Sequence, residues 1–175
     1  MPASKLIDSA LPGVRVVELS QFAGGSSCAE FLAWLGADVV KVEPPAGASG
    51  RCANEHEPGV DSYDFILLNA NKRSVTCDLE SKRGKADFGK LLAKADVVIV
   101  HLAPNAIERL GFAYDTVRQI NPRIIFAQIS GFASDGPRAK FLSSDQVAQA
   151  SGGALSGTGY KGGTPLIPGP NIADT

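Results

Sequence analysis

The sequence predicts an α/β fold with a mostly parallel sheet and helices on both of its faces. Residues 14–45 form one complete βαβ unit, with β-branched runs at 14–19 and 38–42 around a Gly/Ser turn (20–27) and an apolar helix (28–35). Such a unit joins two parallel strands by a right-handed crossover. About five strand-like runs alternate with helical patterns along the chain. Two of them, 96–102 and 123–130, are continuously apolar, as strands covered on both faces are.

Composition restricts the class of protein. The 175 residues suffice for one domain with a core, and the net charge of −1 gives no general attraction to nucleic acid or to an anionic membrane. The apolar runs are too short to span a bilayer, and the first residues lack the apolar stretch of a secretory signal. Cys28, Cys52 and Cys77 form no CxxC pair, so we expect no zinc site, no disulfide framework and a reduced, cytoplasmic setting.

The elements between residues 1 and 95 follow in order. Residues 1–13 are a lead-in, and residues 44–64 are a long loop rich in Pro, Gly and charge, a kind that is usually functional or mobile. An apolar piece (65–68) precedes a strand at 75–79. Ser81 suits a helix N-cap. From there to residue 94, one helical face carries Phe88, Leu91, Leu92 and Ala95.

The second half continues the alternation. After the strand at 96–102, Pro104 suits the first position of a short helix that ends at Gly111. A further helix at 114–120 precedes the strand at 123–130. A turn-rich loop then leads to a helix at 145–150, where Asp145 is expected to act as a helix cap. A Gly/Ser tract (151–163) and a Pro/Gly-rich loop complete the sequence.

Ligands of open parallel sheets bind beyond the carboxyl ends of the strands, which places residues 20–27 and the segment after Glu43 at the functional edge. The dinucleotide fingerprint GxGxxG is absent from the segment SQFAGGSSC, which disfavours an NAD-dependent dehydrogenase. Gly24 and Gly25 would let a ligand approach a helix N-terminus closely, or simply make a tight turn. Spacing alone favours the turn.

Other candidate residues also have two interpretations. The turn NANKRS gathers Asn71, Lys72 and Arg73, either to hold a phosphate or as a solvated turn. A lone histidine at the end of an apolar strand, such as His101, is more often a hydrogen-bonded core residue than a catalyst. No Ser-His-Asp, Cys-His, HExxH or paired-carboxylate pattern is present. By its residue type alone, Asp174 would be a helix cap.

Longer stretches carry a resemblance that no single motif provides. They are LPGVRVVELSQFAGG, LAWLGADVVKVEPPAG, NANKRSVTCDLES, ADVVIVHLAPNAIERLGFAYDTVRQINPRIIFAQISGFASDGP, DQVAQASGGALSGTG and PGPNIADT. In this order, over residues 11–175, they resemble the N-terminal part of class III (CaiB/BaiF-type) CoA-transferases. This family includes formyl-CoA:oxalate and carnitine CoA-transferases, and α-methylacyl-CoA racemase is a relative.

The resemblance implies a Rossmann-like large domain, of which residues 14–175 would be the N-terminal portion. The smaller domain and the returning C-terminal segment would be absent from this chain, and the full-length protein would be an interlocked homodimer. Asp174 would be the nucleophile, attacking an acyl-CoA thioester to give first a mixed anhydride and then an aspartyl-CoA thioester. CoA would then pass to an acceptor carboxylic acid, with CoA as substrate and no permanent cofactor or metal.

The family's CoA contacts correspond to three segments and one arginine of this chain. The first segment is Phe22 and Ala23, the second is Cys77, Asp78, Leu79 and Glu80, and the third is His101, Leu102 and Ala103. The arginine is Arg109, which corresponds to a phosphate contact. Relative to the oxalate enzyme, Pro44, Glu80, His101 and Leu142 replace an arginine, a lysine, an asparagine and a lysine. These replacements leave the phosphate contacts and the substrate acids open.

Two alternatives remain beside the transferase. The racemases have a histidine where this chain has Ser144, so the pair of bases needed for proton abstraction is missing and a transferase is preferred. The other alternative is a non-catalytic, CoA-binding fragment of a longer protein.

Overall fold

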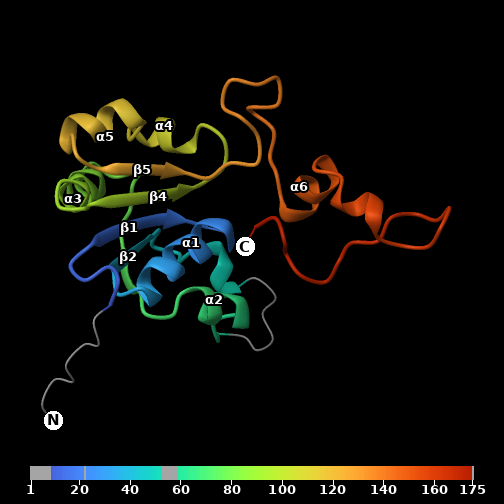
Figure 1. Cartoon of the computed structure of the whole chain (residues 1–175). Helices are drawn as coiled ribbons and strands as arrows, with labels where there is room; N and C mark the ends of the chain where they lie inside the picture. Colours follow the sequence, from blue (N-terminus) through green and yellow to red (C-terminus); the bar gives the residue numbers. More distant parts are fainter. Residues whose placement is uncertain (1–8, 22, 53–58, 175) are drawn as a thin grey trace, which may run out of the picture.

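The architecture was obtained as a computed structural model, which describes residues 9–21, 23–52 and 59–174 (Figure 1). Five strands form one sheet in the order β3-β2-β1-β4-β5, and every neighbouring pair is parallel. The strands are β1 (Arg15–Ser20), β2 (Asp38–Glu43), β3 (Arg73–Thr76), β4 (Val97–His101) and β5 (Ile125–Gln128). The predicted α/β fold with a parallel sheet is therefore confirmed.

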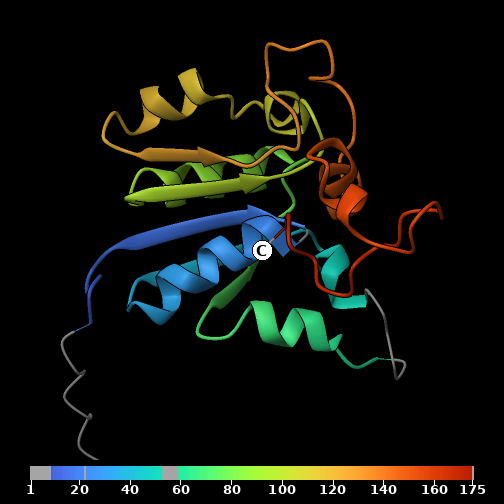
Figure 2. The same ribbon diagram turned by 45° about the vertical axis from the view of Figure 1, so that its right-hand side comes forward.

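Helices cover both faces of the sheet, as predicted. On one face α1 (Ala23–Trp34) packs Ala29 and Ala33 against Val16 and its neighbours, and Figure 2 shows α1 running along the front of the sheet. On the other face α3 (Lys82–Leu92), α4 (Ala106–Leu110) and α5 (Tyr114–Ile120) bury a larger cluster that includes Val17. Successive residues of a strand point to opposite faces, which is why Val16 and Val17 belong to different clusters.

The start of α1 differs from the prediction. Residues 20–27 were expected to be a Gly/Ser turn, but the helix begins at Ala23. The small residues are there for close packing, because a Cβ on Gly25 would lie 2.6 Å from the Cβ atoms of both Ser20 and His101. Glycine thus allows the first turn of α1 to press against the ends of β1 and β4.

The strand predicted at 75–79 is also shifted. β3 spans Arg73–Thr76 and pairs with Val40–Glu43 of β2, so the residues from Cys77 onward lie beyond its carboxyl end. β3 is an edge strand with a single neighbour, and its extent is set by the length of β2 and not by its own apolar run. This shift brings residues 77–80 to the edge where ligands bind.

Local cap signals were predictive in some places and wrong in others. The Ser81 Oγ accepts a hydrogen bond from the Gly84 amide at 3.0 Å, and Gly111 ends α4 with φ of 89°. Pro104 is not the first residue of α4, which begins after Asn105, a residue with φ of 58°. Two further short helices are present: residues 65–68 belong to α2 (Tyr63–Leu68), and η1 (Ser49–Cys52) lies in the long loop.

The sheet order creates the place for a site. From β1 the chain moves to β2 on one side, and it later returns to place β4 on the other side of β1. The connections therefore diverge at the carboxyl ends of β1 and β4, the usual position of a ligand crevice. After β5 the chain swings out to α6 (Asp145–Ser151) and η2 (Ala154–Gly157), and it returns so that residue 174 lies beside the first turn of α1 (Figure 1). In the described part of the chain no helix is both long and apolar enough to cross a membrane.

Candidate active site

A cleft of about 360 Å³ opens at the carboxyl ends of β1, β2 and β4. One wall is the turn after β3, and the opposite wall is the segment after β4 together with α4. Seven of the residues selected from the sequence line it: Cys77, Asp78, Leu79, Glu80, Leu102, Ala103 and Arg109. The structure thus gathers residues from two distant segments, 77–80 and 102–109, at one crevice.

The turn at residues 77–80 is held tightly in place. The Cys77 thiol donates to the Gly84 carbonyl at 3.3 Å, and the Asp78 carboxylate accepts from the Glu80 amide at 3.0 Å. A Cβ on Gly84 would lie 1.9 Å from the Asp78 carbonyl oxygen, so only glycine permits this approach. Burial raises the pKa of the Cys77 thiol, which stays protonated and structural.

Glu43 also reaches the cleft, but its charge is already matched. Burial by itself would raise the pKa of Glu43, but hydrogen bonds from Arg51, Ser74 and the Ala48 amide outweigh it and lower this pKa to about 2. Both carboxylate oxygens of Glu43 lie 2.7 Å from Arg51 nitrogens, and the guanidinium lies 4.0 Å from the Phe65 ring centre. Among the described residues that line the cleft, Arg109 is therefore the cation available for a phosphate.

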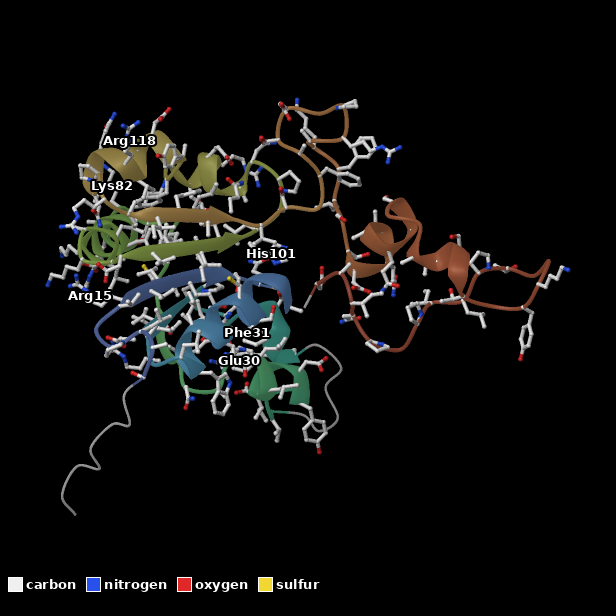
Figure 3. All side chains as sticks on the ribbon, viewed as in Figure 1. Arg15, Glu30, Phe31, Lys82, His101 and Arg118 are labelled. Carbon is white, nitrogen blue, oxygen red and sulfur yellow. The ribbon has the colours of Figure 1, made fainter. Side chains whose placement is uncertain are left out.

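Asp174 and His101 meet at the first turn of α1. The Ser27 hydroxyl donates to the Asp174 carbonyl at 3.4 Å, and this carbonyl oxygen would lie 3.2 Å from a Cβ on Gly24. The Gly25 amide donates to Nδ1 of His101 at 3.1 Å. Figure 3 shows His101 at the end of the sheet, next to the returning chain.

The electrostatic setting separates the two side chains. Burial lowers the pKa of His101, against the attraction of Asp174, so the imidazole is neutral at pH 7. Since Nδ1 accepts the Gly25 hydrogen bond, the ring proton is on Nε2. Burial raises the pKa of the Asp174 carboxyl; His101 opposes this shift and Asp145 adds to it. A carboxylate with a raised pKa is a stronger nucleophile than a fully solvated one.

Asp145 is a site residue that the sequence analysis missed. Its Oδ1 accepts hydrogen bonds from the backbone amides of Ala173 (2.8 Å) and Asp174 (3.3 Å). Its expected role as a helix cap is wrong, because Ser144 occupies the N-cap position and Asp145 is the first residue of α6. No local pattern could have revealed the contact, since its partners lie 28 and 29 residues away.

The turn at residues 71–73 does not reach the cleft. The Lys72 ammonium is buried 2.8 Å from Oε2 of Glu18, and burial lowers the pKa of Lys72 although Glu18 opposes this. Arg73 lies 2.7 Å from Asp38 at the amino end of β2, the edge opposite the cleft. Asn71 is an exposed turn residue with φ of 60°.

The first loop lies beside a larger cavity of about 640 Å³. Ala23, predicted to contact CoA, lines this cavity together with Lys41, Phe65 and Asp174. Phe22, the other residue predicted from this loop, lies outside the described residues. Over the described ranges, no group of three or more His, Cys, Asp or Glu side chains is arranged to hold a metal ion.

Comparison with known proteins identifies the family. Residues 11–175 match CoA-transferase family III, and the chain belongs to this family. It is 45% identical over 166 residues to a formyl-CoA:oxalate CoA-transferase of Streptomyces avermitilis, covering 95% of this chain and 40% of that protein. The protein of the same name from Bradyrhizobium diazoefficiens is 41% identical over 167 residues, with 95% and 39% covered. The chain thus spans about two fifths of the length of these curated relatives.

Solved structures agree with this assignment. A crystal structure of a CAIB/BAIF family protein from Brucella suis superposes with a TM-score of 0.88 at 34% identity, covering 95% of this chain and 45% of that one. The hypothetical protein Rv3272 of Mycobacterium tuberculosis gives a TM-score of 0.85 at 32% identity, with the same coverage. The predicted resemblance and the Rossmann-like α/β fold are both confirmed.

Proposed function

We propose that this chain supplies the CoA-binding cleft and the nucleophilic carboxylate of an acyl-CoA:carboxylate CoA-transferase. The observation that carries the proposal is the position of Asp174, which lies against the first turn of α1 at the same sheet edge as the cleft. Membership of the family and the names of its relatives support CoA as the transferred group.

The proposed reaction runs through two kinds of covalent intermediate, an aspartyl anhydride and an aspartyl-CoA thioester. A carboxylate oxygen of Asp174 attacks the acyl-CoA carbonyl carbon; the C–S bond breaks, and a mixed anhydride and CoA thiolate form. The thiolate attacks Cγ of Asp174, which releases the donor acid and leaves an aspartyl-CoA thioester. The acceptor carboxylate then attacks this Cγ and expels the thiolate, which gives a second mixed anhydride. The thiolate attacks the acceptor's carbonyl carbon in this anhydride; the C–O bond breaks, a new acyl-CoA forms, and the Asp174 carboxylate is restored. The thioester bond energy is retained throughout.

The surrounding groups suit the charges that develop in these steps. The positive end of α1, a helix of 12 residues, lies beside Asp174 and favours an oxyanion or thiolate there. The neutral His101 offers its Nε2 proton as a hydrogen-bond donor. We assign the CoA phosphates to Arg109 and the turn at 77–80. The contacts of Lys72 with Glu18 and of Arg73 with Asp38 favour structural roles for these two cations.

Intact-mass spectrometry of the full-length protein mixed with a panel of acyl-CoAs tests the proposal. We expect a CoA or acyl adduct on the Asp174 peptide, and Asp174→Asn is expected to lose the adduct and at least about 1,000-fold in kcat. Arg109→Gln is the companion variant: it is expected to raise the KM for acyl-CoA about tenfold while the adduct still forms at saturation. No adduct with any acyl-CoA, together with turnover by Asp174→Asn, would contradict the mechanism. Exchange of the substrate α-proton into deuterated water would indicate the racemase instead.

Three further parts of the proposal rest on the family resemblance. They are a cytoplasmic location, a homodimer of the full-length protein, and the assignment of residues 14–175 to the N-terminal portion of the CoA-binding domain. Light scattering on the full-length protein tests the dimer. The donor and acceptor acids are open, and the same acyl-CoA panel will identify them.

A further inference from the structure

We propose that Asp145 is the positioning residue of this site: its carboxylate holds the backbone at residues 173–174 and thereby fixes where the Asp174 side chain points. The catalytic consequence rests on the function proposed above, whereas the structural consequence can be measured without it. The two are therefore tested separately.

The geometry around Asp145 is that of a built anchor. One carboxylate oxygen receives two consecutive backbone amides, those of Ala173 and Asp174, at 2.8 and 3.3 Å. The other oxygen receives Nε2 of Gln149 at 2.5 Å. Asp145 and Gln149 are 6% and 2% exposed, so these charge-assisted bonds are shielded from water.

The segment that carries Asp174 needs such an anchor. Residues 159–173 are almost entirely exposed and contain no helix or strand, so packing holds them weakly. Asp145, by contrast, lies in the first turn of α6, a regular element. Two adjacent amides bound to one carboxylate fix the peptide plane between Ala173 and Asp174, and the hydrogen bond from the Ser27 hydroxyl to the Asp174 carbonyl restrains rotation about the N–Cα bond; together they set the direction of the Cα–Cβ bond of Asp174. A nucleophile misplaced by about 1 Å loses about 100-fold in rate.

Asp145 also acts on Asp174 through its charge. Among the described residues, the charged and titratable groups around Asp174 are His101 from β4, Asp145 from α6, and Lys41 and Asp64, from β2 and α2, which line the same cavity. Burial and the Asp145 carboxylate both raise the pKa of Asp174, and His101 lowers it. Removal of the Asp145 charge should therefore lower this pKa and move the acidic limb of the rate profile to lower pH.

Gln149 makes it possible to separate geometry from charge. Its Oε1 is buried and has no hydrogen-bond partner among the described residues. In Asp145→Asn, the asparagine oxygen can keep both backbone amides, and its NH₂ group replaces the oxygen that faced Gln149. A half-turn of the Gln149 amide then presents Oε1 to this NH₂ group. Asp145→Asn thus keeps the anchor and removes the charge, whereas Asp145→Ala removes both.

Hydrogen exchange and kinetics on the full-length protein test the proposal. In Asp145→Ala, we expect exchange of the amides at 173–174 to accelerate about tenfold or more, kcat to fall about 100-fold, and the KM for acyl-CoA to stay within about twofold. In Asp145→Asn, we expect unchanged exchange and an acidic limb at lower pH. Asp87→Ala, on the exposed face of α3, is the matched control and should change neither measurement.

The outcomes are distinguishable. Unchanged exchange in Asp145→Ala, or faster exchange with full kcat, would overturn the positioning role. If Asp145→Ala does not fold, Asp145→Leu keeps the side-chain volume and also removes the acceptor, and unchanged exchange of the amides at 173–174 in this variant would overturn the positioning role. An acidic limb that does not move in Asp145→Asn would contradict the charge effect alone. Retention of activity and adduct by Asp174→Asn would instead remove the proposed function and leave the exchange result standing.

Discussion

Replacement of Glu18 by glutamine should remove the carboxylate that contacts two buried ammonium groups. The Glu18 side chain is completely buried, with Nζ of Lys41 at 2.6 Å from Oε1 and Nζ of Lys72 at 2.8 Å from Oε2. Both lysine side chains are 2% exposed. The hydroxyl groups of Ser20 and Ser26 also donate to Oε1. Glutamine keeps the volume but removes the negative charge on which the cluster depends.

The size of the effect follows from burial. Removing one partner of a buried ion pair costs about 3–5 kcal/mol, because the remaining charge stays desolvated. For a protein of this size, about 2–4 °C of Tm is lost per kcal/mol, so Glu18→Gln should lower Tm by about 6–20 °C. Lys72→Met should cost less, since it leaves one lysine facing one glutamate.

The effect should also depend on pH. Burial lowers the pKa of Lys72 in the folded protein, so between this pKa and the ordinary lysine value the unfolded chain binds more protons. Stability therefore rises with pH in that window, and more steeply in Glu18→Gln, where the opposing attraction is gone. Alkaline conditions should restore part of the lost stability.

Urea denaturation followed by far-ultraviolet circular dichroism, at pH 7 and pH 10, measures both effects. The control is Asp38→Asn, which breaks the Arg73–Asp38 pair, whose side chains are 67% and 49% exposed. It should cost less than about 1 kcal/mol. A loss of similar size in Glu18→Gln, or no recovery at pH 10, would refute the reasoning about the buried cluster.

Three other predictions concern the same region. Gly25→Ala should lower the free energy of unfolding by about 1–3 kcal/mol, because the added Cβ would lie 2.6 Å from the Cβ of His101. Gly89→Ala lies inside α3, where an added Cβ meets nothing within 4 Å, and should raise it by about 0.5–1 kcal/mol. Equal effects of the two variants in urea denaturation would contradict this. The low pKa of Glu43 stabilises the fold above about pH 4.5, and this stability should be lost as pH falls toward about 2. Glu43→Gln should lack that part of the pH dependence. The same pH dependence of stability in Glu43→Gln and the unmodified protein would argue against this role of Glu43. Asp174→Asn should raise Tm at pH 7, because the Asp174 carboxyl has a raised pKa in the folded protein. The gain in Tm should shrink as pH falls and the Asp174 carboxyl becomes protonated. A lower Tm at pH 7 would contradict the raised pKa.

Local sequence signals were sufficient where structure is decided locally. The β-branched runs predicted the ends of four strands to within about two residues, because these strands are largely buried and need continuous apolar sequence. Ser81 and Gly111 marked helix ends because their caps involve residues three or four positions away. The turn at 77–80 and the segment 102–103, which the family resemblance matched to CoA contacts, line one cleft, because parallel strands all present their carboxyl ends at the same edge.

The sequence by itself thus determined the class of fold, the order of its elements, the family and, through the family resemblance, seven of the residues that line the cleft. The tertiary structure alone decided which charges are matched: it placed Lys72 against Glu18 and Arg73 against Asp38, although the two are adjacent in one basic turn. It also decided that the first turn of α1 is a helix built on close approach and that Asp145 holds Asp174. Such contacts join segments that the folded sheet brings together, and no pattern within a single segment records which distant side chain will be its partner.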